Sequence, residues 1–438
     1  MSRRTAALVS AALLLGVLGV LETATARGET VAATTVAIVG GTVHTLGPAG
    51  TIEGGTVVIE GGKVKAVGRD VAVPSGARRI DAAGKVVTPG LMDSMTRLGL
   101  VEVGQVEGTN DTRANQDDRF TAAFDVVDGI NPRSILFPIT RVEGVTRAVV
   151  APQPGKSLIA GRGAVIHLGT ERDDWLLSSP AAMYAVLGES GAEHAGGARG
   201  AAMLRLREAL QDALDYGANR AAFDQGDRRP YALSRLDLEA LQPVVKGELP
   251  LVITVNRASD IEAALRLARD FHLKLIVAGA REAWEVARQL VDAKVPVLLD
   301  PLANLPGSFE ELGSTLEAAA RLHRAGVTVA FMTGDAHDVR NIKQAAGNAV
   351  SYGMPWEAAL AALTIVPARI WGIADRYGTL EPGKDADVVV WDGDPLETTS
   401  YPEHVFIRGA EIPQDTRQLR LRDRYKDQSG EMPPAYRH

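Results

Sequence analysis

Residues 89–99 read Pro89-Gly90-Leu91-Met92-Asp93-Ser94-Met95-Thr96-Arg97-Leu98-Gly99, and the rest of the chain is organised around this stretch. An apolar run precedes the Pro-Gly pair, which is typical of a turn. The residues after the turn predict a short strand. Because side chains alternate along a strand, Asp93, Met95 and Arg97 share one face of it. The strand therefore carries a charged, polar end.

The first 26 residues have the pattern of a signal peptide. Two arginines precede an apolar segment at 6–21, and Ala24-Thr25-Ala26 supplies a small-residue cleavage site. The alternative is a membrane anchor, but the apolar run is shorter than the roughly 20 residues that a spanning helix needs. We expect cleavage after Ala26, a periplasmic or secreted protein, and no stable membrane insertion afterwards.

Composition narrows the class of protein and its partners. The chain has 438 residues, enough for one large barrel and a smaller domain. A net charge of -7, without a Lys/Arg patch interleaved with aromatic residues, gives no reason to expect a nucleic-acid partner. The absence of cysteine excludes disulfides, cysteine nucleophiles and cysteine metal ligands.

Two separated β-rich blocks lie near the ends of the chain. Residues 34–88 contain β-branched hairpins with Gly-Gly turns, and short strands return at 387–391 and 405–409. These blocks predict one composite β-sandwich built from 34–88 and 372–412. Residues 413–438 are polar and predict a loosely held tail.

The middle of the chain, 89–371, alternates apolar strand-like runs with helical patterns such as 259–271 and 281–293. Such alternation favours a parallel barrel. Seven strand candidates lie at 91–96, 145–150, 163–168, 251–255, 273–277, 295–299 and 327–332. An eighth has no clear pattern, since 171–250 is mostly helical in character.

The opening stretch resembles the first barrel strand of the amidohydrolase superfamily, which usually reads Pro-Gly-Leu-Ile-Asp-x-His-x-His. Residues 359–368 resemble the helix after the last barrel strand of the imidazolonepropionase-like branch, and 378–389 (Gly-Thr-Leu-Glu-Pro-Gly-Lys-Asp-Ala-Asp-Val-Val) resemble the return into its sandwich. The resemblance implies an α/β fold, a TIM-like (β/α)8 barrel with a composite β-sandwich. It also implies a hydrolase of C–N bonds in non-peptide or cyclic amides.

The resemblance further implies one or two metal ions, usually Zn, at the barrel mouth. The ligands would be two His on the first strand, one His after each of the fifth and sixth strands, and an Asp after the eighth. Only the last is kept, as Asp335 in Thr333-Gly334-Asp335. The other ligand positions hold Met95, Arg97, Thr254, Asn256 and Gly279. Met and Thr are poor Zn ligands and Arg97 brings a fixed positive charge, so we expect no metal cofactor.

Two hypotheses for function remain open. In the first, the protein is an exported amidohydrolase with a rebuilt site, in which Asp335 is the general base. Substrate would be bound by Arg97, Asn256, Arg257 and His337. In the second, it is a non-catalytic family member that binds a small molecule in the barrel mouth, forms a homo-oligomer, or partners an active amidohydrolase. The charge at the ligand position separately predicts an ion pair between Arg97 and Asp335, which would replace the charge of the metal; the alternative is that Arg97 points into solvent at the mouth.

The remaining histidines have structural interpretations. His167 ends a predicted strand and is expected to be a hydrogen-bonded wall residue. His194 follows a Gly-rich segment and is expected to be exposed. No His-x-His or His-x-x-x-His spacing occurs in the chain, so these residues predict no metal site of their own.

Overall fold

The computed structural model describes residues 35–114, 120–170, 173–227, 229–303 and 305–426. The predicted signal peptide at 1–26 and the last residues of the predicted tail lie outside the described residues. In these ranges no helix is both long enough and apolar enough to cross a lipid bilayer.

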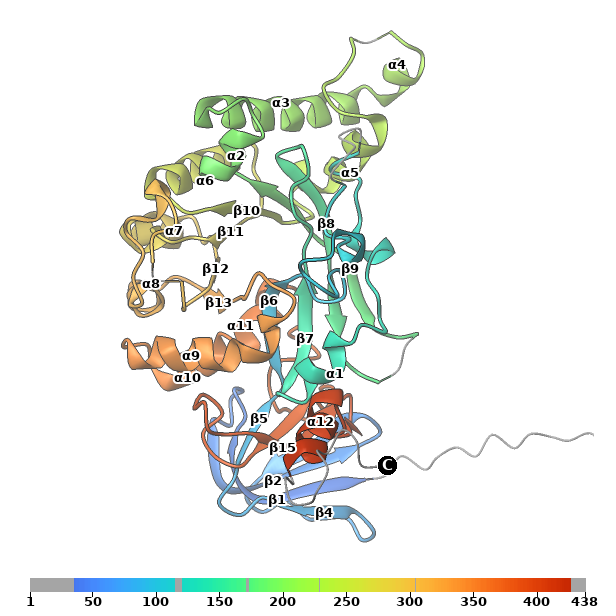
Figure 1. Ribbon diagram of the computed structural model, residues 1–438, viewed down its shortest axis with the longest axis vertical. Helices are drawn as coiled ribbons and strands as arrows, with labels where there is room; N and C mark the ends of the chain where they lie inside the picture. The colour runs from blue at the N-terminus through green and yellow to red at the C-terminus, as the bar shows by residue number, and fades with distance from the viewer. Residues whose placement is uncertain (1–34, 115–119, 171–172, 228, 304, 427–438) are drawn as a thin grey trace, which may run out of the picture.

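Strands from both ends of the chain form one mixed sheet, at the bottom of Figure 1, where the first and last parts of the chain lie side by side. Its strands are β1 (Val36–His44), β2 (Thr51–Glu60), β3 (Lys63–Gly68), β4 (Arg78–Asp81), β5 (Val86–Pro89), β14 (Val388–Trp391), β15 (Pro402–Ile407) and β16 (Ala410–Glu411). Strand β5 joins the two ends, because it pairs parallel with β1 and antiparallel with β14. Apolar side chains from both ends share one core, which explains why neither block forms the sheet alone.

The barrel is a second eight-stranded sheet. Its strands, in spatial order, are β6 (Leu91–Thr96), β7 (Val145–Val150), β8 (Ile159–His167), β9 (Leu176–Val186), β10 (Leu251–Val255), β11 (Leu275–Gly279), β12 (Val297–Leu299) and β13 (Val329–Phe331). The ends of β6 and β13 meet through backbone hydrogen bonds, from Gly334 N–H to the Met95 carbonyl (2.9 Å) and from Arg97 N–H to the Asp335 carbonyl (3.0 Å). The predicted fold class, an α/β barrel with a separate sheet built from both ends, is confirmed.

One barrel strand runs against the others, which corrects the prediction of a parallel barrel. Strand β8 pairs antiparallel with both β7 and β9. The connections at 151–158 and 168–175 are too short for the crossover of a dozen or more residues that parallel neighbours need. The eighth strand is β9, whose pattern is interrupted by Ser178-Ser179-Pro180.

Helices cover the outside of the barrel. They are α1 (Leu136–Arg141), α2 (Gly188–Glu193), α3 (Arg199–Ala218), α4 (Arg220–Asp224), α5 (Arg235–Val245), α6 (Ala258–Asp270), α7 (Ala287–Asp292), α8 (Ala318–Ala325), α9 (Ile342–Ser351), α10 (Trp356–Ala361) and α11 (Ile365–Ile370). Short 3-10 turns lie at η1 (Glu107–Thr109), η2 (Val126–Asp128), η3 (Ala283–Val286), η4 (Phe309–Glu311) and η5 (Asp338–Asn341). The predicted helix 281–293 is divided between η3 and α7. Part of the predicted tail is helical, as α12 (Arg417–Lys426).

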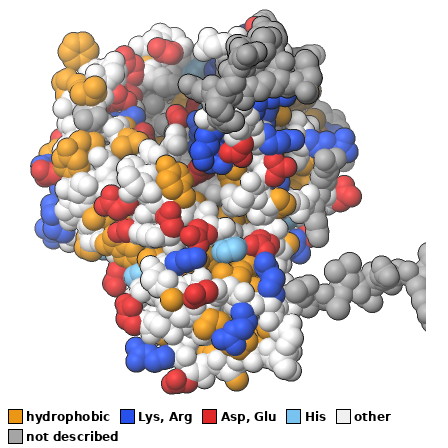
Figure 2. Space-filling view, turned by 60° about the horizontal axis from the view of Figure 1, so that its bottom comes forward, with side chains coloured by type: hydrophobic (Ala, Val, Ile, Leu, Met, Phe, Trp, Pro, Cys, Tyr) orange, Lys and Arg blue, Asp and Glu red, His pale blue; other side chains and the backbone are white. Residues whose placement is uncertain are grey.

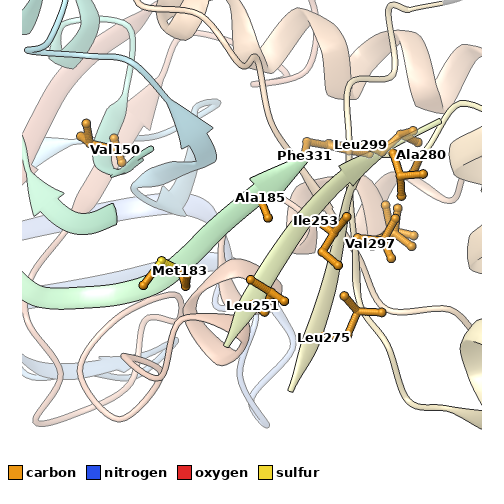
Figure 3. Packing of buried hydrophobic residues seen from close by; sticks show 14 of the residues in the cluster. Val150, Met183, Ala185, Leu251, Ile253, Leu275, Ala280, Val297, Leu299 and Phe331 are labelled. Carbon is orange, nitrogen blue, oxygen red and sulfur yellow. The ribbon is translucent and has the colours of Figure 1, made fainter. Parts of the chain in front are cut away.

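Strand alternation sorts the barrel side chains into two apolar layers. Leu251 and Ile253 of β10 pack outward with neighbours such as Leu275 and Val297, in the layer between strands and helices (Figure 3). The intervening Val252 belongs to the cluster inside the barrel. Since side chains alternate, Thr254 also faces inward, one step nearer the mouth.

The closed end of the barrel is joined to the mixed sheet by a buried ion pair. Arg147 of β7 and Asp387, which precedes β14, lie 2.7 Å apart, and their side chains are only 2% and 6% exposed. The Arg147 guanidinium also lies 4.1 Å from the centre of the Tyr377 ring. Burial raises the pKa of the Asp387 carboxyl, and the charge of Arg147 opposes that shift.

A second carboxylate of the 378–389 motif, that of Asp385, also joins the barrel to the mixed sheet. Asp385 is buried and pairs with Arg376 at 2.7 Å and with Lys63 of the mixed sheet. The 378–389 motif thus ties the barrel to the sheet through its two aspartates. On the outer surface, Figure 2 shows Lys/Arg and Asp/Glu side chains interspersed rather than gathered by sign.

Candidate functional site

A cavity of about 380 Å³ opens at the mouth of the barrel. Its walls come from the C-terminal ends of β6, β7, β9 and β10 and from the first residues of β8. Met95, Arg97 and Thr254, which the sequence placed at metal-ligand positions, all line it. The prediction that residues far apart in the sequence meet at the mouth therefore holds for these three.

The end of β6 is irregular, and the irregularity directs its side chains. The pairing of β6 with β7 shifts register between Asp93 and Thr96. Met92 and Met95 both reach the apolar cluster inside the barrel, although they are an odd number of residues apart. The shift resets the alternation, so that Met95 and Arg97 face the cavity together.

Arg97 is held by a neutral partner. With the Gln153 amide turned so that its groups match their surroundings, its oxygen accepts from Arg97 at 2.6 Å (Nη2), 3.0 Å (Nη1) and 3.2 Å (Nε), and its nitrogen donates to Thr112. Burial lowers the pKa of the Arg97 guanidinium, the Asp335 carboxylate raises it, and the charge of Arg113 lowers it further. A charged group is thus half-buried at the mouth beside a second cation.

The predicted ion pair between Arg97 and Asp335 is wrong. Their backbones are hydrogen-bonded across the barrel seam, but no side-chain ion pair joins them in the part of the chain that the structure describes. The Asp335 carboxylate instead accepts from the backbone N–H groups of His337 (2.6 Å) and Asp338 (3.1 Å). His337 Nε2 lies 3.2 Å from the Glu102 carbonyl. Local hydrogen bonds thus organise this loop, with Asp335 about half exposed.

Asn256 and Arg257 lie on the other side of the mouth and face protein carboxylates. Asn256 donates to Glu311 at 3.1 Å and to Glu310 at 3.4 Å. Arg257 pairs with Asp260 at 2.8 Å. Glu310 and Glu311 belong to η4, in the loop after β12, so this loop closes the mouth over β10 and β11. The substrate-binding roles predicted for Asn256 and Arg257 stay untested. The Asn256 amide nitrogen and Arg257 Nη2 contact carboxylates, whereas Asn256 Oδ1 and Arg257 Nε have no hydrogen-bond partner among the described residues.

Gly279, at the end of β11, makes this closure possible. Its backbone has φ +80, a conformation that favours glycine, and a Cβ atom here would lie 2.7 Å from Asn256 Oδ1. Any larger residue at 279 would therefore displace Asn256, which holds the loop after β12. The glycine at position 279 and the asparagine at position 256 therefore depend on each other structurally.

Several residues of the cavity were not predicted from the sequence; they include Arg113 and Gln153, and two more come from β9 and from the end of α2. Tyr184 of β9 is 4% exposed and lines the cavity, and its hydroxyl has no hydrogen-bond partner among the described residues. His194, predicted to be exposed, is half-buried and also lines the cavity, because α2 leads back over the mouth after β9. If β9 had been recognised as a barrel strand, the sequence would have placed Tyr184 and His194 at the mouth.

Asp93 is a buried carboxyl beside the site. It is fully buried at the seam, where it accepts from Met95 N–H (3.0 Å) and from the Thr333 hydroxyl (2.6 Å). Burial raises the pKa of Asp93 to about 7, against the opposing effect of these hydrogen bonds. Asp93 therefore fastens the two strands that close the barrel.

Comparisons with known proteins agree with this architecture. The model of the amidohydrolase family matches residues 255–415. The crystal structure of an amidohydrolase from Thermotoga maritima MSB8 is 28% identical, with a TM-score of 0.77 over 87% of this chain and 100% of that one. The chain is therefore similar to members of the amidohydrolase superfamily in both sequence and fold.

Two curated relatives match this chain over smaller shares of their own length. Amidohydrolase tasK of Hapsidospora irregularis is 24% identical over 77% of this chain and 37% of its own length. An imidazolonepropionase of Maricaulis maris is 29% identical over 42% of this chain and 44% of its own. The chain thus spans about two-fifths of the length of the curated relatives it matches.

The side chains at the mouth do not fit the zinc that superfamily resemblance implies. Zinc in proteins takes imidazole, thiolate and carboxylate ligands. Here the corresponding positions carry a thioether, a guanidinium, a hydroxyl, an amide and a glycine. Within the described ranges, no three His, Asp or Glu side chains gather so as to hold a metal ion.

Proposed function

We propose that this chain is a member of the amidohydrolase superfamily that binds a small molecule in the barrel mouth and does not hydrolyse it through a zinc-bound water. One observation carries the proposal. Arg97 turns a guanidinium toward the cavity at a position where the resemblance places a metal ligand. The cavity is kept, while the group that would bind a cation is itself a cation.

The charge argument is physical. A guanidinium stays protonated in proteins and cannot serve as a ligand. Like charges a few ångströms apart in a partly buried site repel strongly, because the surrounding dielectric is lower than that of water. The neighbouring Arg113 adds to the positive field at the mouth. Such a site disfavours a divalent cation.

A hydrolase with a rebuilt site is the second candidate, and the similarity to proteins named amidohydrolases favours it. Asp335 would be its general base, with Arg97 and His337 supporting the substrate. Asp335 follows Gly334 in the cavity wall, and its side chain is about half exposed, so it is accessible to water. Without a Lewis acid to polarise the carbonyl, such a site would be slow.

Location and assembly complete the proposal. The mature chain would begin after Ala26 and work in the periplasm or outside the cell. It would act alone, as a homo-oligomer, or beside an active amidohydrolase. Intact mass of the chain recovered from the periplasm checks the cleavage site, and light scattering checks the assembly.

The test of function is a hydrolysis assay with cyclic amides and dipeptides, with and without added Zn²⁺. We expect no turnover above that of the Asp335→Asn variant, which keeps the size of the side chain but cannot act as a base. Turnover that the wild type shows and Asp335→Asn loses would favour the hydrolase. Turnover that appears only with Zn²⁺ would contradict the metal-free proposal.

A further inference from the structure

We infer that the ligand of the mouth cavity is a small carboxylate, held by Arg97 and Arg113 and by the hydroxyl of Tyr184, which lines the same cavity. The inference rests on the proposed binding function and adds the chemical class of the ligand. It follows from the charges at the cavity, from one buried donor without a partner, and from the shape of the space.

The cations that line the cavity outnumber the lining carboxylates, and the Asp335 carboxylate next to Gly334 is a further charge that acts on Arg97. Arg97 and Arg113 both line it, and neither forms an ion pair with a carboxylate of the described residues. They are near enough for the charge of Arg113 to lower the pKa of Arg97. Among the described lining residues, Glu193 is the one carboxylate, and it is exposed. Two guanidiniums converging on one space are stabilised by a bound anion.

Arg97 keeps donors for such an anion. The guanidinium has five N–H groups, and its partner is a single neutral oxygen of Gln153. Gln153 in turn bonds to Thr112, so the planar group is held in place before a ligand arrives. A held guanidinium loses less entropy on binding than a free one, and its fork matches the two oxygens of a carboxylate.

Tyr184 is the independent observation. Its hydroxyl is buried in the cavity wall without a hydrogen-bond partner in the described chain. A buried hydroxyl without a partner costs about 1–3 kcal/mol of stability, and an acceptor on a bound ligand would remove that cost. A carboxylate oxygen accepts from both a phenol and a guanidinium. His194 adds a further polar group at the rim.

The other lining residues of the cavity determine which size and polarity of ligand fits beside the carboxylate. Met95, Ala151, Ala160 and Val186 present apolar surface beside the cations. A cavity of about 380 Å³ is near the lower end of the range for small-molecule sites. The geometry therefore suits a carboxylate on a compact apolar or aromatic body.

The experiment compares benzoate with its neutral isostere benzamide by titration calorimetry on the purified protein. We expect benzoate to bind about tenfold or more tightly than benzamide. Arg97→Gln should weaken benzoate by about tenfold and Arg113→Gln by about threefold, with little change for benzamide. Arg266→Gln, an exposed arginine on α6, is the matched control and should change neither affinity.

Tyr184→Phe gives a readout that a merely structural role would not produce. Removing the unpartnered hydroxyl should leave the melting temperature unchanged or raise it, because a buried group without a partner is lost. The same change should weaken benzoate by about threefold to tenfold. A melting temperature that falls while benzoate affinity holds would show that the hydroxyl serves the fold.

Failure of this inference can be told from failure of the proposed function by Met95→Trp, which fills the cavity. Equal binding of benzoate and benzamide, lost in both cases in Met95→Trp, would overturn the carboxylate inference and leave the cavity as a binding site. Benzoate binding that survives Met95→Trp would overturn both. No binding of benzoate up to its solubility limit would also overturn the inference, whatever neutral ligands do.

Discussion

The two ends of the barrel treat buried charge in opposite ways. At the closed end, Arg147 meets the carboxylate of Asp387 at 2.7 Å and both are almost fully buried. At the mouth, the Arg97 guanidinium donates to the amide oxygen of Gln153, forms no ion pair with a described carboxylate, and stays half-buried beside Arg113. At the closed end the two charges are paired within the chain, whereas the guanidinium at the mouth forms no ion pair with a described residue. The first arrangement holds two domains together, and the second is suited to a ligand.

The largest loss of stability is expected when the ion pair at the closed end is broken. Arg147→Met leaves the buried Asp387 carboxylate without its cation, and we expect a loss of about 3–5 kcal/mol in the free energy of unfolding. Urea denaturation measures it. In the double variant Arg147→Met/Asp387→Leu no charge is left unpaired, so much of the stability should return. A double variant as unstable as the single one would show that the charges are not the cause.

A comparable effect should come from the seam, where Asp93 has a pKa raised to about 7. The folded state then holds a proton that the unfolded chain releases near pH 4, so stability should fall as pH rises from about 4 to about 7. The fall should be on the order of 4 kcal/mol. Asp93→Asn should flatten this part of the profile, while the exposed Asp70→Asn should follow wild type. Equal slopes in all three proteins would contradict a raised pKa at Asp93.

Restoring a histidine at the mouth should also be unfavourable. Gly279→His puts a Cβ atom 2.7 Å from Asn256 Oδ1 and forces a side chain onto a backbone at φ +80. We expect a loss of about 1–3 kcal/mol, seen as a lower melting temperature. Gly279→Ala should show most of the loss, and adding Asn256→Ala should recover the part due to the clash. A Gly279→His variant as stable as wild type would refute the dependence of the two sites.

The smallest effect on stability is expected at Arg97 itself. Arg97→Gln removes a half-buried charge whose partner is neutral, so the free energy of unfolding should change by no more than about 0.5 kcal/mol. Chemical denaturation beside Arg147→Met sharpens the comparison between the two ends. A loss as large as that of Arg147→Met would mean that the mouth charge also serves the fold.

Much of the fold was predictable because its signals are local. Gly-Gly hairpins marked the mixed sheet, and the motifs around 89–99 and 378–389 marked its junctions with the barrel. The prediction of strand direction failed at β8, because short connections reverse the chain on both sides of it. The position of β9 was not predicted, because small and polar residues interrupt its strand pattern. Reading the lengths of those connections would have revealed the reversal.

The sequence predicted several residues that lie at the mouth of the barrel, but it did not predict which side chains contact each other there. Met95, Arg97 and Thr254 meet at the cavity because barrel strands end at one mouth. The partners of Asn256 come from a loop distant in the sequence, which no local pattern shows. The Arg97–Asp335 ion pair failed because adjacent backbones do not fix where long side chains point. The Arg97 guanidinium donates hydrogen bonds to the amide oxygen of Gln153 and not to the Asp335 carboxylate.

The central claim is that the barrel has been kept and the metal given up. The most direct test is the metal content of the purified protein, expressed with ample Zn²⁺, Fe²⁺ and Mn²⁺ and never exposed to a chelator. Elemental analysis against a quantified protein concentration should find far less than one equivalent of any of these metals per chain. One equivalent that stays bound through gel filtration would contradict the account.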